Sequence, residues 1–348
     1  MVSKESSSKI RARAPLRLGL AGGGTDVSPF SNEFGGYVLN VTIGKYANVT
    51  ITPRKDGLVE LVAADREMSW NGPATEVLPL VKGLELHVGV YNRIVNEFGH
   101  KEPLSISVVT HSEAPPGSGL GSSSTMVVAL IQAFREYLTL PLGEYDVARL
   151  AYEIERVDLG LAGGKQDQYA AAFGGLNFME FYGDRVIVNP LRIKPEHRAE
   201  LESSLVLFFT GVSRESANII NEQVQNVKRG NEDSLQAMHA LKAEAVHMKE
   251  AILQGDFEAL AAAMRNSWKA KKKMVHLISN AKINEIYEAA IKEGALAGKV
   301  SGAGGGGFMM FMVDPAKRPQ VIKCLSDFSP SISTCMFVEH GAHSWRVA

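Results

Sequence analysis

Residues 115–125 read Pro-Pro-Gly-Ser-Gly-Leu-Gly-Ser-Ser-Ser-Thr, a glycine-rich turn followed by a run of hydroxyl side chains. Apolar residues then recur every three or four positions, which predicts an amphipathic helix beginning near Ser122, with the hydroxyls of 122–125 suited to cap it. Glycines at positive φ let backbone N–H groups approach an anion, and a helix start adds free N–H groups and a positive dipole end. The stretch therefore favours a phosphate-binding loop over an ordinary capped turn.

The length and net charge of the chain indicate how many domains it has and what kind of ligand it binds. A chain of 348 residues is longer than a single core usually supports, which favours two domains that share a cleft. The 37 basic and 38 acidic side chains nearly cancel, which argues against a nucleic-acid-binding surface and for a small-molecule ligand. We find no apolar run of membrane-spanning length and no signal-peptide core, so we expect no membrane partner and a cytoplasmic location.

The pattern along the chain is typical of an α+β protein. Residues 10 to about 181 alternate strand-like runs with glycine loops and helices, including a helix at about 144–159. Later residues favour strands at 205–210, 308–313 and 332–339 and long helices at about 216–227, 233–254, 256–278 and 283–293. We therefore expect a polar, disordered lead-in over 1–9 and domains over 10–190 and 191–348. Four lysines of the 256–278 helix are interpreted as a solvated face: Lys269, Lys271, Lys272 and Lys273.

Three further glycine-rich segments could meet the first in one cleft. Residues 15–26 carry Arg17 in an apolar strand and end in Gly22-Gly23-Gly24-Thr25-Asp26. Residues 163–175 place Asp167 between two Gly-Gly pairs, and residues 301–307 form the last segment. Arg17 could supply a cation to a transferring phosphoryl group or lie at a sheet edge. Asp26 could hold a ligand or cap its own turn.

Two common nucleotide-binding signatures fit poorly. A Walker A loop requires lysine after its last glycine, whereas Ser122 follows Gly121. The glycines at 302, 304 and 307 have GxGxxG spacing, but a predicted strand follows them instead of a helix. A nicotinamide-dependent dehydrogenase is therefore disfavoured.

Three segments resemble, in order, the motifs of the GHMP small-molecule kinases: Ala14-Pro15-Leu16-Arg17, residues 115–124 and residues 299–307. Residues 22–26 and 163–169 are most similar to the D-glycero-D-manno-heptose 7-phosphate kinases within that superfamily. The resemblance covers nearly the whole chain. It implies an N-terminal domain like domain 2 of ribosomal protein S5, a ferredoxin-like C-terminal domain and an active site between them.

The resemblance also implies roles in phosphoryl transfer, with ATP and Mg²⁺ as cofactors. Asp167 would be the catalytic base and Arg17 its partner. Ser123 and Glu155 would bind Mg²⁺, with Glu153 as the alternative to Glu155. The residues expected to wrap the ATP phosphates are Pro116, Gly117, Ser118, Gly119, Leu120, Gly121, Ser122, Ser123 and Ser124.

The implied substrate is a phosphosugar, with Asp26 holding sugar hydroxyls. The other residues expected to bind it are Gly23, Gly24, Thr25, Lys45, Gly163, Gly164, Lys165, Gln166, Arg214, Gly304 and Gly305. Lys45, Lys165 and Arg214 are candidates for a distal phosphate, although each could equally be a surface charge.

The reaction that the resemblance implies is phosphorylation of the anomeric hydroxyl of a heptose 7-phosphate, which would supply nucleotide-heptose and surface polysaccharide synthesis. One alternative is a kinase of an unphosphorylated sugar such as fucose or galactose. Another is a catalytically silent sensor that binds sugar and ATP. The sequence leaves a homo-oligomer open.

Overall fold

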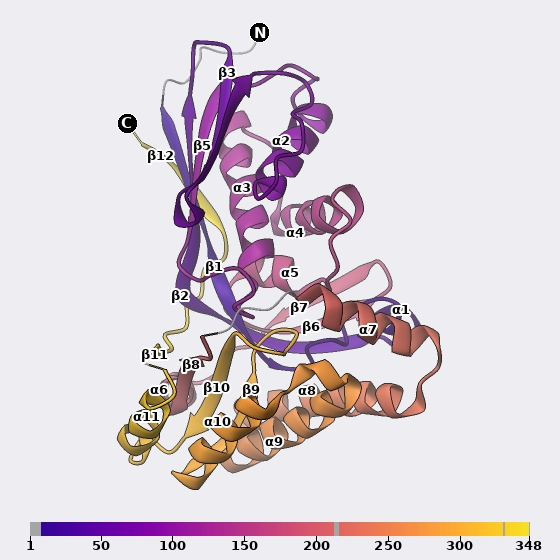
Figure 1. The fold of residues 1–348 in the computed structure, drawn as a ribbon, viewed down its shortest axis with the longest axis vertical. Helices are drawn as coiled ribbons and strands as arrows, with labels where there is room; N and C mark the ends of the chain where they lie inside the picture. Colours follow the sequence, from indigo (N-terminus) through magenta and orange to yellow (C-terminus); the bar gives the residue numbers. More distant parts are fainter. Residues whose placement is uncertain (1–7, 212–215, 330, 348) are drawn as a thin grey trace.

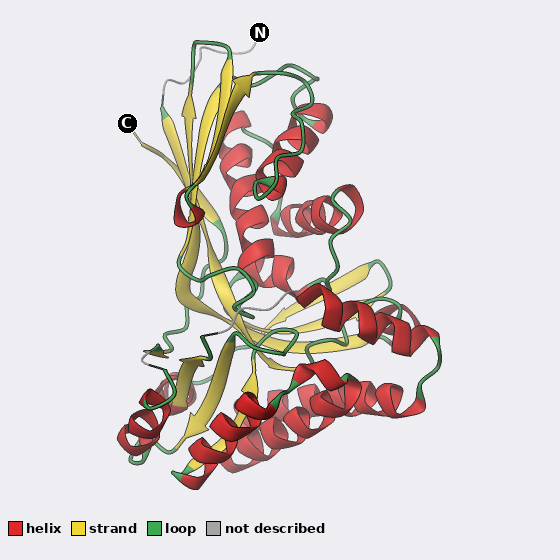
Figure 2. Cartoon of the chain, viewed as in Figure 1, coloured by secondary structure: helices red, strands yellow, loops and turns green. Residues whose placement is uncertain are grey.

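A computed structural model describes residues 8–211, 216–329 and 331–347. It contains two β-sheets, each with helices packed against it (Figures 1 and 2). This mixture of helix and strand confirms the α+β class.

The first sheet has eight strands, in the order β12-β1-β2-β5-β3-β4, with β6 beside β2 and β7 beside β6. The long strand β2 pairs with β5 over its C-terminal part and with β6 over its N-terminal part, so the sheet divides along it. The strands are β1 (Lys9–Ala21), β2 (Gly36–Pro53), β3 (Leu58–Ala63), β4 (Met68–Pro73), β5 (Ile106–Ser112), β6 (Leu176–Tyr182), β7 (Arg185–Pro190) and β12 (His343–Val347).

The helices of residues 85–173 lie on one side of this sheet (Figure 1). Helix α3 packs against β1 and β2, and it begins at Ser122 as predicted. The predicted helix at 144–159 is regular only as far as Glu153, and a wider π-helical turn continues it over Ile154–Asp158. The helices of this half are α1 (Phe30–Phe34), α2 (Glu85–Glu97), α3 (Ser122–Leu138), α4 (Glu144–Glu153) and α5 (Gln166–Phe173), with a 3-10 turn at Ala64–Arg66.

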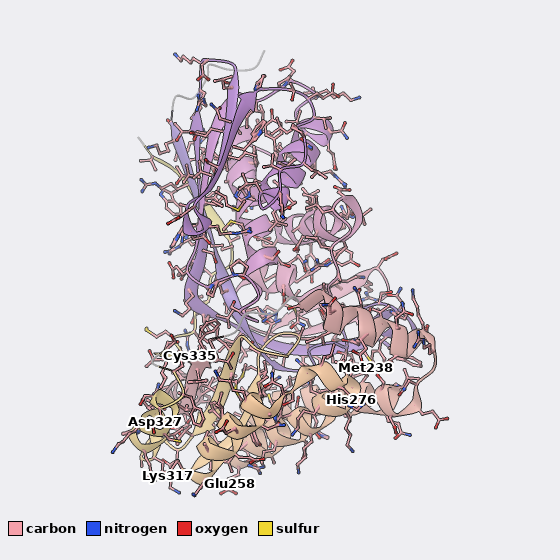
Figure 3. The ribbon with its side chains drawn as sticks, in the orientation of Figure 1. Met238, Glu258, His276, Lys317, Asp327 and Cys335 are labelled. Carbon is pink, nitrogen blue, oxygen red and sulfur yellow. The ribbon has the colours of Figure 1, made fainter. Side chains whose placement is uncertain are left out.

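The second sheet is antiparallel, in the order β11-β8-β10-β9. Its strands are β8 (Leu205–Phe209), β9 (Ala295–Val300), β10 (Phe308–Val313) and β11 (Ile332–Thr334). The helices of this half are α6 (Pro195–Ser204), α7 (Ser216–Lys228), α8 (Glu232–Gln254), α9 (Phe257–Met274), α10 (Ala281–Lys292) and α11 (Arg318–Ser326), with a 3-10 turn at His276–Ile278. Charged side chains such as Glu258 and Lys317 are exposed here, whereas Met238 is buried (Figure 3).

The chain returns to the first sheet after β11, so the predicted strand at 332–339 is too long. Beyond Thr334 the backbone crosses to β2, where the N–H of Val338 donates to the carbonyl of Thr42. Strand β12 then pairs with β1, with Lys9 opposite Val347. Lys9 therefore belongs to a strand, although we expected the lead-in to run to residue 9.

An apolar core joins the two halves. Leu16, Leu18 and Leu20 of β1 are buried in one cluster with Met248 of α8 and Met264 of α9. The first and second halves therefore share buried surface, and the division at residue 190 stays a prediction. None of the described helices is long and apolar enough to cross a membrane.

Candidate active site

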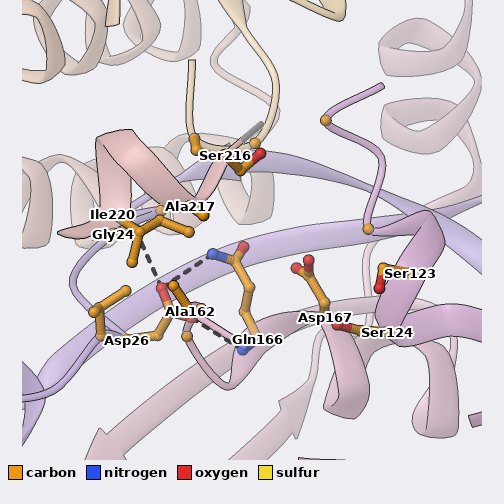
Figure 4. Close-up of a pocket in the computed structure, with 18 of the residues that line it drawn as sticks. Gly24, Asp26, Ser123, Ser124, Ala162, Gln166, Asp167, Ser216, Ala217 and Ile220 are labelled. Atoms are coloured by element: carbon orange, nitrogen blue, oxygen red, sulfur yellow. Dashed lines mark hydrogen bonds between the residues drawn. The ribbon is translucent and has the colours of Figure 1, made fainter. Parts of the chain in front are cut away.

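One cavity is lined by residues from all four glycine-rich segments (Figure 4). They contribute Arg17, Gly23, Gly24, Asp26, Gly117, Gly119, Gly121, Ser122, Ser123, Ser124, Gly163, Gly164, Gln166, Asp167, Gly302 and Ala303. Helices α7 and α9 supply Ser216, Ala217, Ile220, Gln223, Lys271 and Met274. Both halves of the molecule therefore form the walls.

The phosphate-loop candidate has the backbone that anion binding requires. Gly117, Gly119 and Gly121 have φ angles of 70°, 81° and 76°, in the left-handed region that favours glycine. Gly121 is the N-cap of α3, and no described side chain caps this helix, so the expected serine cap is wrong. The first-turn hydroxyls of Ser123 and Ser124 line the cavity instead. The N-terminus of α3 is therefore open to an anionic ligand.

The last glycine-rich segment supports this loop from behind. A Cβ at Gly302 would lie 2.7 Å from the Gly119 Cα, so only glycine fits where the two backbones cross. The Ser301 hydroxyl donates to the Gly119 carbonyl at 2.8 Å, and the Phe308 N–H donates to the Ser118 carbonyl at 2.8 Å. Residues 301–308 thus fix the shape of the loop.

Asp167 and Arg17 form an ion pair beside the loop. The Arg17 Nε donates to Asp167 Oδ1 at 2.8 Å, and Nη2 lies 2.6 Å from the same oxygen. Arg17 Nη1 donates to the Gly119 carbonyl at 2.6 Å, and the arginine is buried. A Cβ at Gly121 would lie 3.2 Å from the Asp167 carboxylate. The serine-rich loop and this carboxylate are therefore direct neighbours.

Glu155 and Ser123 face each other across the same wall. The Ser123 hydroxyl lies 3.3 Å from Glu155 Oε1, and Gln168 Nε2 donates to Oε2. Glu155 is only 1% exposed, and burial raises the pKa of its carboxyl group while the nearby Arg156 opposes that effect. Glu153 instead forms an ion pair with Arg93 at 2.6 Å. This arrangement favours Glu155 over Glu153 as the cavity carboxylate.

The π-helical turn explains the inward position of Glu155. Adjacent residues of a regular helix point about 100° apart, so Ile154 and Glu155 would not normally share one face. Both are buried here, at 0% and 1% exposure. The wider turn therefore brings the carboxylate into the wall, as π-bulges often do at functional sites.

The Asp26 carboxylate joins two of the glycine-rich segments. Oδ1 accepts from the Gly24 N–H at 3.1 Å and from Gln166 Nε2 at 3.0 Å. Oδ2 accepts from the N–H group of Gln166 at 3.0 Å (Figure 4). It also accepts from the N–H group of Lys165 at 2.9 Å. Burial raises the pKa of this carboxyl group, and the N–H of Gln166 opposes the shift. Asp26 therefore caps α5 as well as lining the cavity.

Some residues expected at the site do not line this cavity. Pro116, Ser118, Leu120, Thr25, Lys45, Lys165, Gly304 and Gly305 are not among the lining residues. The Lys165 ammonium donates to the Gly183 carbonyl, so only the lysine backbone reaches Asp26. The Thr25 hydroxyl is buried against the carbonyls of Gly22 and Tyr37. Arg214 lies outside the described residues.

Two cations that line the cavity, Lys271 and Arg156, were not predicted from the sequence. Lys271 is 3% exposed, so our interpretation of the α9 lysines as a solvated face is wrong for this residue. Helical spacing contains the missing signal, because Leu260, Met264, Ser267, Lys271 and Met274 recur at the buried period of α9. Arg156 follows Glu155 in the π-helical turn and also lines the cavity.

Comparisons with known proteins give the family. The GHMP kinase N-terminal domain model matches residues 85–175, and the GHMP kinase C-terminal model matches residues 248–330. A Campylobacter jejuni protein named D-glycero-alpha-D-manno-heptose 7-phosphate kinase is 50% identical over 97% of this chain and 99% of its own length.

Two solved structures agree over the whole fold. A D-glycero-D-manno-heptose 1-phosphate kinase from Bacteroides thetaiotaomicron is 44% identical, with a TM-score of 0.83 over 97% of this chain and 99% of its own. A putative sugar kinase from Campylobacter jejuni is 47% identical, with a TM-score of 0.82 over 99% of this chain and 100% of its own. The resemblance noted in the three motifs is therefore confirmed, and the chain belongs to the GHMP kinase family.

Proposed function

We propose that this protein transfers the γ-phosphoryl group of ATP to the anomeric hydroxyl of D-glycero-D-manno-heptose 7-phosphate. The 1,7-bisphosphate product would serve nucleotide-heptose and surface polysaccharide synthesis, and we place the reaction in the cytoplasm. The observation that carries the proposal is the Arg17–Asp167 ion pair beside Gly121, at the open start of α3. The name of the 50% identical relative supports the choice of sugar.

The proposed chemistry needs one base and several fixed charges. The sugar hydroxyl oxygen attacks the γ-phosphorus, the bond to the β,γ-bridging oxygen breaks, and ADP leaves. Asp167 takes the hydroxyl proton, while the ion pair with Arg17 fixes the position of its carboxylate. Positioning by the loop and charge stabilisation supply most of the rate enhancement.

The oxygen donors of Ser123 and Glu155 suit Mg²⁺. This hard cation binds through one or two carboxylates together with nucleotide phosphates, and the described chain contains no cluster of three histidine, cysteine or acidic side chains. We propose that Ser123 and Glu155 would hold Mg²⁺, which would supply positive charge to the ATP phosphates.

The sugar would lie on the side of the cavity where Asp26 is placed. Gly23, Gly24, Gly163, Gly164 and Gln166 line this region and leave room for hydroxyl groups. The distal phosphate requires a cation. Arg214 stays a prediction for that role, and Arg156 is a further candidate because it lines the cavity, which Lys45 and Lys165 do not.

A substrate panel tests the proposal. The protein is incubated with ATP, Mg²⁺ and heptose 7-phosphate, heptose 1-phosphate, fucose or galactose, and phosphorus NMR locates the new phosphate. We expect turnover of the 7-phosphate with the new group on the anomeric carbon. The solved relative named as a 1-phosphate kinase makes transfer to another carbon the main competing result. Activity on free sugars alone, or sugar binding without turnover, would overturn the proposal.

Asp167→Asn tests the base directly. The amide keeps the shape of the side chain but cannot accept the hydroxyl proton, so turnover should fall at least a hundredfold. ADP affinity, measured by calorimetry, should stay within a few-fold of the parent. A variant that turns over normally would remove Asp167 from the mechanism.

A further inference from the structure

Lys271 is a buried cation with no carboxylate of the described residues in direct contact, although the buried Asp26 lies in the same cavity. Its side chain extends from α9 to the cavity wall, where the ammonium donates to the Gly302 carbonyl. Within the described part of the chain it forms no ion pair. A buried charge is costly unless it is paired, so this position suits a site that receives an anion.

The neighbouring lysines of α9 show that this burial is specific. Lys269, Lys272 and Lys273 are exposed, whereas Lys271 is 3% exposed and shares the inward face with Met274. The four residues come from one short stretch of helix. Lys271 is therefore positioned by the fold for the cavity, and Lys269 offers a matched control for the removal of one α9 charge.

The contacts of Lys271 place it near the expected γ-phosphate. Its partner Gly302 packs directly against Gly119 of the phosphate loop. The Gly119 carbonyl in turn accepts from Arg17, the partner of Asp167. Lys271 is thus connected to the loop through Gly302, and Gly119 and Arg17 continue this series of contacts to the proposed base. It approaches from the second half of the molecule.

We propose that Lys271 binds the γ-phosphoryl group as it is transferred and acts as a second catalytic cation beside Arg17. This inference rests on the proposed kinase function. As the β,γ-bridge bond breaks, negative charge lies on the phosphoryl oxygens, and the remaining ammonium protons of Lys271 can donate to them. The carboxylate of Asp26 is held by four protein N–H donors, which leaves the lysine available to the incoming anion.

The test compares Lys271→Met with Lys269→Met. Methionine fills the buried space without charge, and Lys269→Met removes the same charge from an exposed position of the same helix. We expect kcat of Lys271→Met to fall by about a hundredfold or more, the typical loss for one transition-state donor, with KM for ATP and sugar changed less than fivefold. Lys269→Met should match the parent.

A second measurement separates catalysis from a structural role. ADP affinity is measured with and without magnesium and aluminium fluoride, which mimics the transferring group, in the presence of the sugar that the parent phosphorylates. Lys271→Met should bind ADP with the affinity of the parent. The increase in ADP affinity caused by magnesium and aluminium fluoride should be at least tenfold smaller in the variant than in the parent. An equal loss of affinity for ADP with and without fluoride would show a structural role and overturn the proposal.

Two other outcomes would also overturn it. A kcat within threefold of the parent would exclude a catalytic role. A tenfold rise in KM for the sugar phosphate alone, absent with the free sugar, would assign Lys271 to the distal phosphate instead. A wrong substrate assignment would show as missing turnover of heptose 7-phosphate by the parent enzyme. A wrong role for Lys271 would instead show only in the ratio of kcat between Lys271→Met and the parent.

Discussion

The protonated side chain of Lys271 should lower the free energy of unfolding of the ligand-free protein at neutral pH. Burial lowers the pKa of its ammonium to about 8; Arg17 lowers it further, and Asp26 opposes the shift. The buried Lys299 of β9 is a second neighbouring amine and interacts unfavourably with Lys271. The Lys271 ammonium has a higher pKa in the unfolded chain than in the folded protein. Below about pH 8 the protonated lysine therefore lowers the free energy of unfolding by about 3 kcal/mol.

Lys271→Met should therefore be more stable than the parent at pH 7, by about 1–3 kcal/mol, because it removes this penalty. The difference should shrink as pH rises through 8 and vanish above about 10, where the lysine is neutral in both states. Urea unfolding at several pH values measures it, with Lys269→Met as the control. A variant less stable than the parent at pH 7 would show that the Gly302 contact outweighs the burial cost.

Glu155 and Glu153 provide a matched test of the metal site. Glu155→Gln removes the charge that faces Ser123, so the Mg²⁺ concentration needed for half-maximal activity should rise at least tenfold. Glu153→Gln breaks only the partly exposed ion pair with Arg93 and should leave that concentration unchanged. A magnesium titration at fixed ATP distinguishes the two, and the reverse result would move the ligand to Glu153.

At the level of the elements, the crossing of two glycine-rich loops determines the shape of the proposed phosphate site. Gly302→Ala places a methyl group against Gly119, which should displace the loop. Gly57 has a similar φ, 73° against 71°, but nothing lies within 4 Å of its added Cβ. Both variants incur the cost of alanine at positive φ, about 1–2 kcal/mol, and only Gly302→Ala adds the clash.

We expect Gly302→Ala to weaken ATP binding at least tenfold and to lower the melting temperature more than Gly57→Ala does. Isothermal titration and thermal unfolding measure the two effects. Equal behaviour of the two variants would mean that the phosphate loop adapts to the methyl group.

At the scale of the whole molecule, the shared core predicts one cooperative unfolding transition. Leu18 of β1 is fully buried in the cluster that also contains Met248 and Met264. Leu18→Ala should cost about 2–5 kcal/mol and shift the whole transition. Scanning calorimetry with circular dichroism tests this, and two separate transitions, only one of them shifted, would show that the halves unfold independently.

Local sequence patterns were enough to predict the fold class, the start of α3 and the glycine-rich turn before it. These features depend on local chemistry: glycines that permit positive φ, apolar residues at the helical period, and hydroxyls directly after a turn. It also indicated Asp167 and Arg17, because a carboxylate between glycine pairs and an arginine in an apolar strand are unusual where they stand.

The packing of the folded chain was needed to show which side chains reach the cavity. The π-helical turn directs Glu155 into the cavity wall. The Lys165 ammonium donates to the Gly183 carbonyl and not to a cavity residue. The packing of α9 buries Lys271. The same packing places the last strand, β12, beside β1. Each of these depends on contacts between segments far apart in the chain, and such contacts fix side-chain direction and burial, which local propensity does not.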